Sequence, residues 1–222
     1  MDELTETGNE KSMVDISDVS FSNKDLKSRV DVKPLKGGGT NFKTHVLIKS
    51  SDSKLMYKPS YGIAIFCFIF LAIGLGLLFL MFRGLIIQDS SADIPVLLLL
   101  IVGGVFTMAG LLMFYHFYKP IVFDKTSGFY LKGYNTNNAT TKKSKTSEQI
   151  ALNTVVALQI IGENVRGSKS SFNSFELNLV LKDGSRKNIV DHGSLKSIVD
   201  DADLLSTFLD IPIWHAKSNE ED

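Results

Sequence analysis

Two uninterrupted apolar stretches dominate the hydrophobic pattern of this 222-residue chain. Residues 61–82, YGIAIFCFIFLAIGLGLLFLMF, and residues 94–118, IPVLLLLIVGGVFTMAGLLMFYHFY, contain no Asp, Glu, Lys or Arg. A helix needs roughly 20 residues to cross a hydrocarbon core about 30 Å thick. The pattern therefore predicts a two-helix transmembrane hairpin over residues 61–118, closed by the short turn 83–93. The alternative, a buried hairpin of a soluble protein, is disfavoured by two such lengths without interior charge.

Small residues recur at helix-contact spacing in both stretches, and they are Ala72, Gly76, Gly103, Thr107 and Gly110. Such residues let two helix backbones approach closely, so we expect them to pack the two spans on each other. Contact with another membrane subunit, as in a homo-oligomer, is the alternative, because a lone hairpin leaves most of its circumference free. The absence of interior acidic or basic residues disfavours a transporter or channel acting alone.

After the second stretch the pattern changes to short alternating runs. Phe175, Leu177, Leu179 and Leu181 alternate with mainly polar residues, which predicts a strand with one apolar face, and Asp183-Gly184 marks its reversal. A two-residue loop would place Leu179 opposite Asn188. A three-residue turn with a glycine bulge would place it opposite Ile189, and we prefer this register because it sets apolar beside apolar.

The remaining elements complete a small β-domain over residues 119–216. Apolar residues at three- and four-residue steps predict a helix over residues 194–209, with Ser194 as N-cap and Pro212 beyond its end. Ile213 and Trp214 are expected to pack back on the sheet. Residues 42–60 read as a further β-hairpin. With that hairpin the inventory is about seven strands and a closing helix, as in a pleckstrin-homology-like barrel; without it the domain is a smaller α+β sheet.

The termini and the charged residues indicate how the chain is oriented in the membrane. Residues 1–41 are polar and predict a disordered tail, and residues 217–222 form an acidic tail. Lysines flank both apolar stretches on their outer sides, so both termini are expected in the cytoplasm. The 24 basic residues balance the 24 acidic ones, which disfavours a nucleic-acid partner. The single cysteine, Cys67, excludes an intramolecular disulfide and offers no cysteine metal cluster.

Candidate chemistry is sparse. Asp191-His192 has no accompanying nucleophile elbow, metal-ligand spacing or glycine-rich phosphate loop, so we expect no enzyme, cofactor or metal, and Asp191, His192 and Gly193 are expected to form the turn before the helix. Basic side chains could meet anionic lipid, although a solvated loop and an exposed strand face are the simpler interpretations. These weak binding candidates are Lys142, Lys143, Lys145, Arg186 and Lys187.

The segments VVALQIIGE, SFELNLVLKDGSRKNIVDHG and FLDIPIWH resemble a family of two-span proteins of proteobacterial inner membranes, whose cytoplasmic part is similar to bacterial pleckstrin-homology-like domains. The resemblance covers about residues 121–215 and implies location and fold rather than a reaction. We therefore expect a non-enzymatic scaffold or assembly subunit of the bacterial inner membrane, with membrane lipid and a protein as partners. The alternative is a membrane-tethered sensor of anionic lipid headgroups.

Overall fold

The structure is a computed structural model that describes residues 25–87, 95–134, 148–167 and 170–217. It contains two units, Met1–Asp31 and Val32–Asp222. In the first unit, the described residues form a short helical segment in which Arg29 and Asp25 make an ion pair of 2.6 Å. Every strand and long helix among the described residues lies in the second unit.

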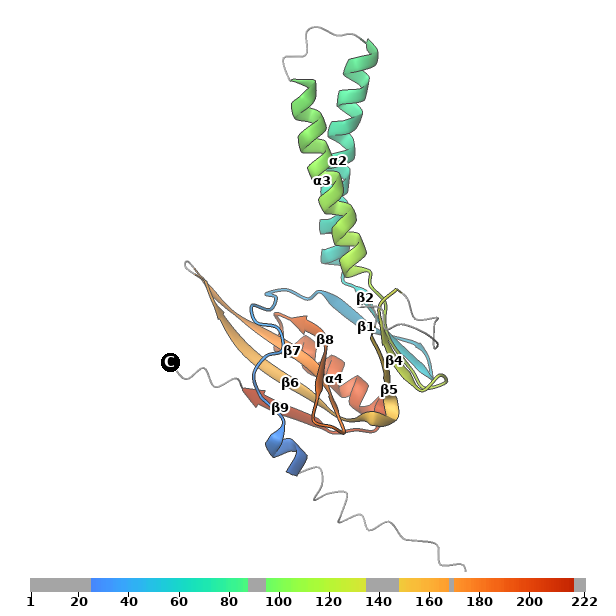
Figure 1. The fold of residues 1–222 in the computed structure, drawn as a ribbon, viewed down its shortest axis with the longest axis vertical. Coiled ribbons are helices and arrows are strands. Elements are labelled where there is room, and N and C mark those ends of the chain that lie inside the picture. The colour runs from blue at the N-terminus through green and yellow to red at the C-terminus, as the bar shows by residue number, and fades with distance from the viewer. Residues whose placement is uncertain (1–24, 88–94, 135–147, 168–169, 218–222) are drawn as a thin grey trace, which may run out of the picture. The chain divides into compact units, whose positions relative to one another are not determined.

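Two long apolar helices, α2 (Tyr61–Ile87) and α3 (Val96–Phe117), pack along each other. Both are long and apolar enough to cross a membrane. Most of their large apolar side chains are exposed, whereas the core helix of a soluble protein buries such side chains. The prediction of a two-helix hairpin is therefore confirmed at the level of the elements (Figure 1).

The contact between the helices uses different small residues in the first span than the sequence suggested. Gly103 and Gly110 are buried, and a Cβ at Gly110 would meet the backbone of Leu71. On α2 the close approach occurs at Gly74, where a Cβ would overlap Thr107. Ala72 and Gly76 are instead exposed on the outer surface of the helix pair. The prediction for the first span was wrong because it chose the wrong face of the helix. Residues two apart on a helix point to different faces, so Ala72 and Gly76 lie away from the face that carries Gly74.

The β-domain consists of two sheets (Figure 1). The first has the order β1-β2-β3-β4-β5, all antiparallel. Its strands are β1 (His45–Ser51), β2 (Lys54–Pro59), β3 (Ile121–Asp124), β4 (Phe129–Lys132) and β5 (Glu148–Ala151). A 3-10 turn, η1 (Leu152–Thr154), leads to the second sheet, of order β8-β7-β6-β9. Its strands are β6 (Val155–Arg166), β7 (Ser171–Leu181), β8 (Arg186–His192) and β9 (Ile213–Lys217).

The helical hairpin is inserted into the first sheet. β2 and β3 are hydrogen-bonded neighbours, with Tyr57 opposite Ile121, although the two helices separate them in sequence. Lys54 and Asp124 close the far end of this pair with an ion pair of 3.1 Å. The hairpin of residues 42–60 is thus an integral part of the β-domain, and the domain is discontinuous in sequence.

One apolar core lies between the two sheets and the helix α4 (Leu195–Leu209). Fully buried Phe123 and Tyr130 from the first sheet join Leu158 and Leu177 from the second, and Ile198 from the helix. The Ser194 side chain accepts a hydrogen bond from Ser197 N, as the capping pattern predicts. The helix ends at Asp210 in the left-handed conformation, with φ of 57°, before Pro212 is reached.

The β7–β8 turn has the preferred form but not the expected register. Gly184 N donates to Leu181 O, and the φ of Gly184 is 82°, as a three-residue turn with a glycine bulge requires. Leu181 N bonds Ser185 O, so Leu179 lies opposite Lys187. Both predicted partners, Asn188 and Ile189, are therefore wrong. A second irregularity after Leu177 restores the pairing of apolar residues further along the strands.

Two features of the second sheet go beyond or differ from the expectations. Ile213 and Trp214 pack back on the sheet as expected, and they do so as part of a ninth strand, β9, which pairs parallel with β6. Asp191 and His192 form the end of β8 rather than the turn before α4, because β8 continues to the pair Phe175–His192.

Candidate functional site

An N-terminal segment, residues 33–44, which we term the strap, is hydrogen-bonded to the second sheet. The Glu176 carboxylate accepts bonds from Leu35 N at 2.8 Å and Lys36 N at 3.1 Å. Ser174 Oγ accepts from Thr40 N at 2.9 Å. Glu176 is only 5% exposed, so the backbone donors compensate a buried carboxylate. Residues 33–41 thus have defined partners, unlike the disordered tail expected there; residues 1–24 lie outside the described residues.

Glycines permit this close approach. A Cβ at Gly39 would overlap Ser174, and a Cβ at Gly193, just after β8, would overlap the backbone of Asn41. Gly38 has a φ of +84°, in the region that glycine favours, and its N–H donates to Glu163 Oε1 at 3.1 Å. The Gly37-Gly38-Gly39 run therefore serves strand contact rather than flexibility.

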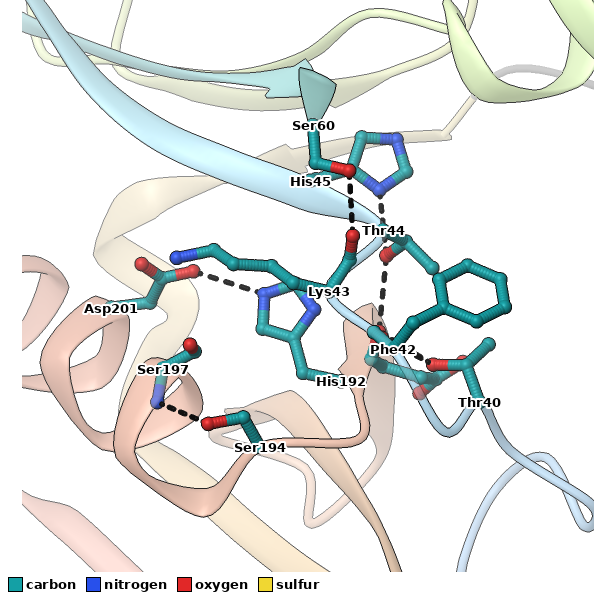
Figure 2. A network of polar contacts seen from close by, with 11 residues as sticks. Thr40, Phe42, Lys43, Thr44, His45, Ser60, His192, Ser194, Ser197 and Asp201 are labelled. Carbon is teal, nitrogen blue, oxygen red and sulfur yellow. Dashed lines mark hydrogen bonds and ion pairs between the residues drawn. The ribbon is translucent and has the colours of Figure 1, made fainter. Parts of the chain in front are cut away.

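Ser60 joins the strap to the first apolar helix (Figure 2). Its Oγ donates to Lys43 O at 2.7 Å, and its N–H donates to Thr44 O at 2.9 Å. The same Oγ accepts from Ile63 N at 3.3 Å, as an N-cap does for the free amides of a first helical turn. One side chain thus fixes the start of α2 to the end of the strap.

His45 joins the strap to the end of the second apolar helix. Its Nε2 lies 3.0 Å from the carbonyl of Phe117, the last residue of α3, and its Nδ1 lies 3.0 Å from Thr44 Oγ1. A carbonyl only accepts, so Nε2 carries the proton. Burial lowers the pKa of His45 to about 4, despite the opposing bond to Phe117, and charges of His192, Lys132 and His116 lower it further. His45 is therefore neutral at pH 7.

A buried pair of polar side chains, His192 and Asp201, lies next to the strap. His192 is fully buried, and its Nε2 is 3.3 Å from Asp201 Oδ2 on α4 (Figure 2). Its Nδ1 has no hydrogen-bond partner among the described residues. The Asp201 carboxylate adds to the effect of burial in raising the pKa of the Tyr57 phenol well above its usual value. The pair fixes α4 to the end of β8.

Lys132 connects the two sheets. Its Nζ donates to the carbonyls of Asn188 and Ile189, each at 2.9 Å, on the outer edge of β8. Burial lowers the pKa of Lys132 to about 8, and the charge of Lys36 acts in the same direction. The strap bonds the same edge, because Thr40 and Thr44 both donate to Asp191 O. Backbone carbonyls on this edge of the sheet are therefore already bonded by Lys132 and by the strap of the same chain.

The basic candidates do not form one site in the described structure. Lys142, Lys143 and Lys145 lie outside the described residues. Arg186 donates to Lys33 O at 2.8 Å and to Gln159 Oε1 at 3.2 Å, so it holds the strap. Lys187 is half-buried opposite Leu179. Among the described residues, no cluster of three His, Cys, Asp or Glu side chains is placed to hold a metal ion.

The residues that hold the strap to the second sheet and to the apolar helices are Glu176, Ser60, His45, Thr44 and Gly193. Of these, the sequence singled out only Gly193, and only as part of a turn. The only local signal was the glycine run at residues 37–39, which composition alone assigns to a flexible tail. The described residues thus define a discontinuous β-domain with an inserted pair of apolar helices. Ser60 and His45 hold the start of α2 and the end of α3 to this domain. No known protein family, curated protein or solved structure matches the chain.

Proposed function

We propose that this protein is a non-enzymatic membrane scaffold, in which the two helices span a bacterial inner membrane and a pleckstrin-homology-like domain at the cytoplasmic face binds a protein partner. The insertion of the helices between β2 and β3 carries the proposal. Since both flanks belong to one sheet, they lie on the same side of the membrane. With only short connections from β2 to α2 and from α3 to β3, the domain has little freedom to turn away from the bilayer.

The edge strand β9 is the surface we assign to the partner. The opposite edge of its sheet, β8, is already bonded by Lys132 and the strap. Within the described residues, β9 pairs only with β6. An extended segment of another protein adds readily to such an edge, because backbone hydrogen bonds supply affinity.

In-cell photo-crosslinking tests this assignment. A photoreactive residue at the exposed position His215 of β9 is compared with one at the exposed Lys182, in the β7–β8 turn. We expect position 215 to crosslink one discrete protein species that survives high-salt washing, and position 182 to give none. The same bands from both positions, or none from position 215, would contradict a partner at β9.

A contact of Tyr134, the last described residue before the lysine-rich segment, favours a second candidate, a sensor of anionic lipid headgroups. Tyr134, just before the loop, stacks on Tyr115 of α3 with ring centroids 4.9 Å apart. Its hydroxyl donates to Tyr115 O at 2.7 Å. The chain that carries Lys142, Lys143 and Lys145 therefore departs beside the membrane helix, where each cation near an anionic surface adds about 1 kcal/mol.

Chemical acylation of lysines in nanodiscs tests this candidate. If the sensor function is right, anionic lipid slows acylation of the three loop lysines and high salt restores it, whereas Lys182 reacts equally in all discs. Equal rates in neutral and anionic discs would exclude headgroup binding by the loop.

A further inference from the structure

The longest strands of the domain form an arm with which no other strand pairs among the described residues. β8 pairs with β7 only as far as Phe175, and β9 pairs with β6 only as far as Gly162. Beyond these positions β6 and β7 continue as a two-stranded ribbon, visible in Figure 1. The strap still contacts the first pair of this ribbon, Glu163–Ser174. The arm beyond the strap consists of the pairs Asn164–Asn173, Val165–Phe172 and Arg166–Ser171, so it extends roughly 10 Å.

The arm lies at the helix end of the domain. Phe175, at its base, pairs with His192, and His192 is bridged to Lys43. The Lys43 carbonyl in turn accepts the bond from Ser60, the residue before α2. The Asp183-Gly184 turn is at the opposite end of β7. The tip at Arg166 and Ser171 thus extends on the side where the apolar helices leave the domain (Figure 1).

The composition of the arm matches a membrane surface. The arm pairs beyond Glu163, residues 164–166 and 171–173, contain no acidic residue, and the Glu163 carboxylate at the base of the arm is bonded to Gly38 N of the strap. Arg166 near the tip is exposed, and Val165 and Phe172 form a cross-strand apolar pair. An isolated two-stranded ribbon is marginal in water, so a surface contact stabilises it. Arginine and an aromatic ring are suited to the interface between headgroups and acyl chains.

We infer that the tip of the β6–β7 arm contacts the anionic lipid surface beside the apolar helices, with Arg166 at the phosphates and Phe172, one pair further from the tip, beside the headgroups; the inference rests on the proposed membrane span of the two helices. The two helices and the arm then attach the domain at separate places, and this fixes its rotation about the helix axis. The contact does not depend on whether a protein partner binds β9. It also differs from the lysine-rich loop, which lies between β4 and β5.

A single tryptophan on the arm tests the inference in the full chain. Phe172→Trp is made in a Trp214→Phe background, reconstituted in nanodiscs whose lipids carry bromine near the headgroup. The matched control, Asp183→Trp in the same background, places the ring on the exposed turn at the other end of β7. In anionic discs we expect strong quenching of the Phe172→Trp variant and little quenching of the Asp183→Trp variant. Adding Arg166→Glu to the arm variant should lower the ratio of bound to free arm by roughly fivefold or more.

Two outcomes overturn the inference: equal quenching of the two variants, or equal quenching of the Phe172→Trp variant in neutral and anionic discs. Hydrogen exchange of the unmodified chain gives the same test without a substitution. The amides of residues 164–166 and 171–173 should exchange more slowly in anionic than in neutral discs, and unchanged rates contradict the contact. Neither measurement uses a protein partner, so failure here leaves the crosslinking result at β9 standing.

Discussion

Gly193 shows how the absence of one side chain positions a segment far away in sequence. It follows β8 directly, and its N–H donates to Phe42 O at 3.1 Å. The backbone of Asn41 occupies the space that a Cβ would need. Because the obstacle is backbone rather than a flexible side chain, the strap cannot yield without losing its bonds to β8.

Gly193→Ala should therefore destabilise the β-domain by about 1 to 3 kcal/mol, the usual range for overpacking. Denaturant unfolding in detergent, followed by fluorescence of the buried Trp214, measures the change. Gly37→Ala is the matched control, since its Cβ would meet only Glu163 Oε1 at an ordinary 3.8 Å. Equal stability of the two variants would show that the strap does not depend on this approach.

Because of His45, the stability of the folded chain depends on pH, and it falls as the pH drops. Its pKa is about 4 in the folded chain and 6.5 ordinarily, so between these values the unfolded chain binds a proton that the folded chain does not. Stability is therefore full above about pH 6.5 and falls as the pH drops toward 4, by up to about 3 kcal/mol.

Thermal unfolding at a series of pH values measures this loss. His45→Gln should flatten the profile between pH 6.5 and 4, whereas His215→Gln, at an exposed position, should leave it unchanged. A His45→Gln profile as steep as that of the unmodified chain would assign the acid sensitivity to other groups.

At the scale of elements, the apolar helices show where sequence patterns are sufficient and where they are not. Two long runs without charge predict the helices themselves, because burial in lipid requires little more. The contacting face is harder to predict, since almost every residue in these runs is apolar and the phase of the helix is undetermined. Gly74 and Gly76 are equivalent in the sequence, yet only Gly74 faces α3.

The two glycines form a natural pair of test positions. Gly74→Val should separate the helices, because its side chain would overlap Thr107, whereas Gly76→Val has nothing within 4 Å of its Cβ. We expect a lower melting temperature of the helix pair in detergent for Gly74→Val alone. Similar melting of both variants would place the contact on another face.

Some of the strands can be predicted from local sequence signals, and others cannot. Alternation over residues 175–181 and the Asp183-Gly184 turn predict a hairpin from local signals alone. β9 and the strap are not predictable in this way, because their partners are distant: β9 adds in parallel to β6, and the strap donates its amides to Glu176 and Ser174. The register of β7 and β8 also depends on an irregularity at Leu177 that no turn residue signals.

At the scale of the whole molecule, the β-domain is divided between two stretches of the chain. Residues 45–59 supply two strands of the first sheet and residues 121–151 supply the other three. A fragment that begins after the helices would lack β1, β2 and the bond from Thr44 to Asp191. Conversely, the helices contribute no strand to either sheet.

A shortened chain that joins Pro59 to Ile121 by a few turn residues should therefore fold as a water-soluble domain. The pairing of Tyr57 with Ile121 already brings the two ends together, and a short loop costs little closure entropy. A fragment of residues 119–217 should fail to fold. Circular dichroism and dispersion of amide NMR signals compare the two, and a folded fragment would show that β1 and β2 are dispensable.

The insertion between β2 and β3 also imposes an order on biosynthesis. A ribosome makes β1 and β2 first, and their neighbour β3 emerges only after both apolar helices have been synthesised. In the proposed topology, the newly made β2 has no partner on its β3 side until the chain has crossed the membrane twice and β3 reaches the side on which β2 lies. Closure of the first sheet therefore requires that both helices have been made, and a chain that ends before β3 leaves β2 without its neighbour.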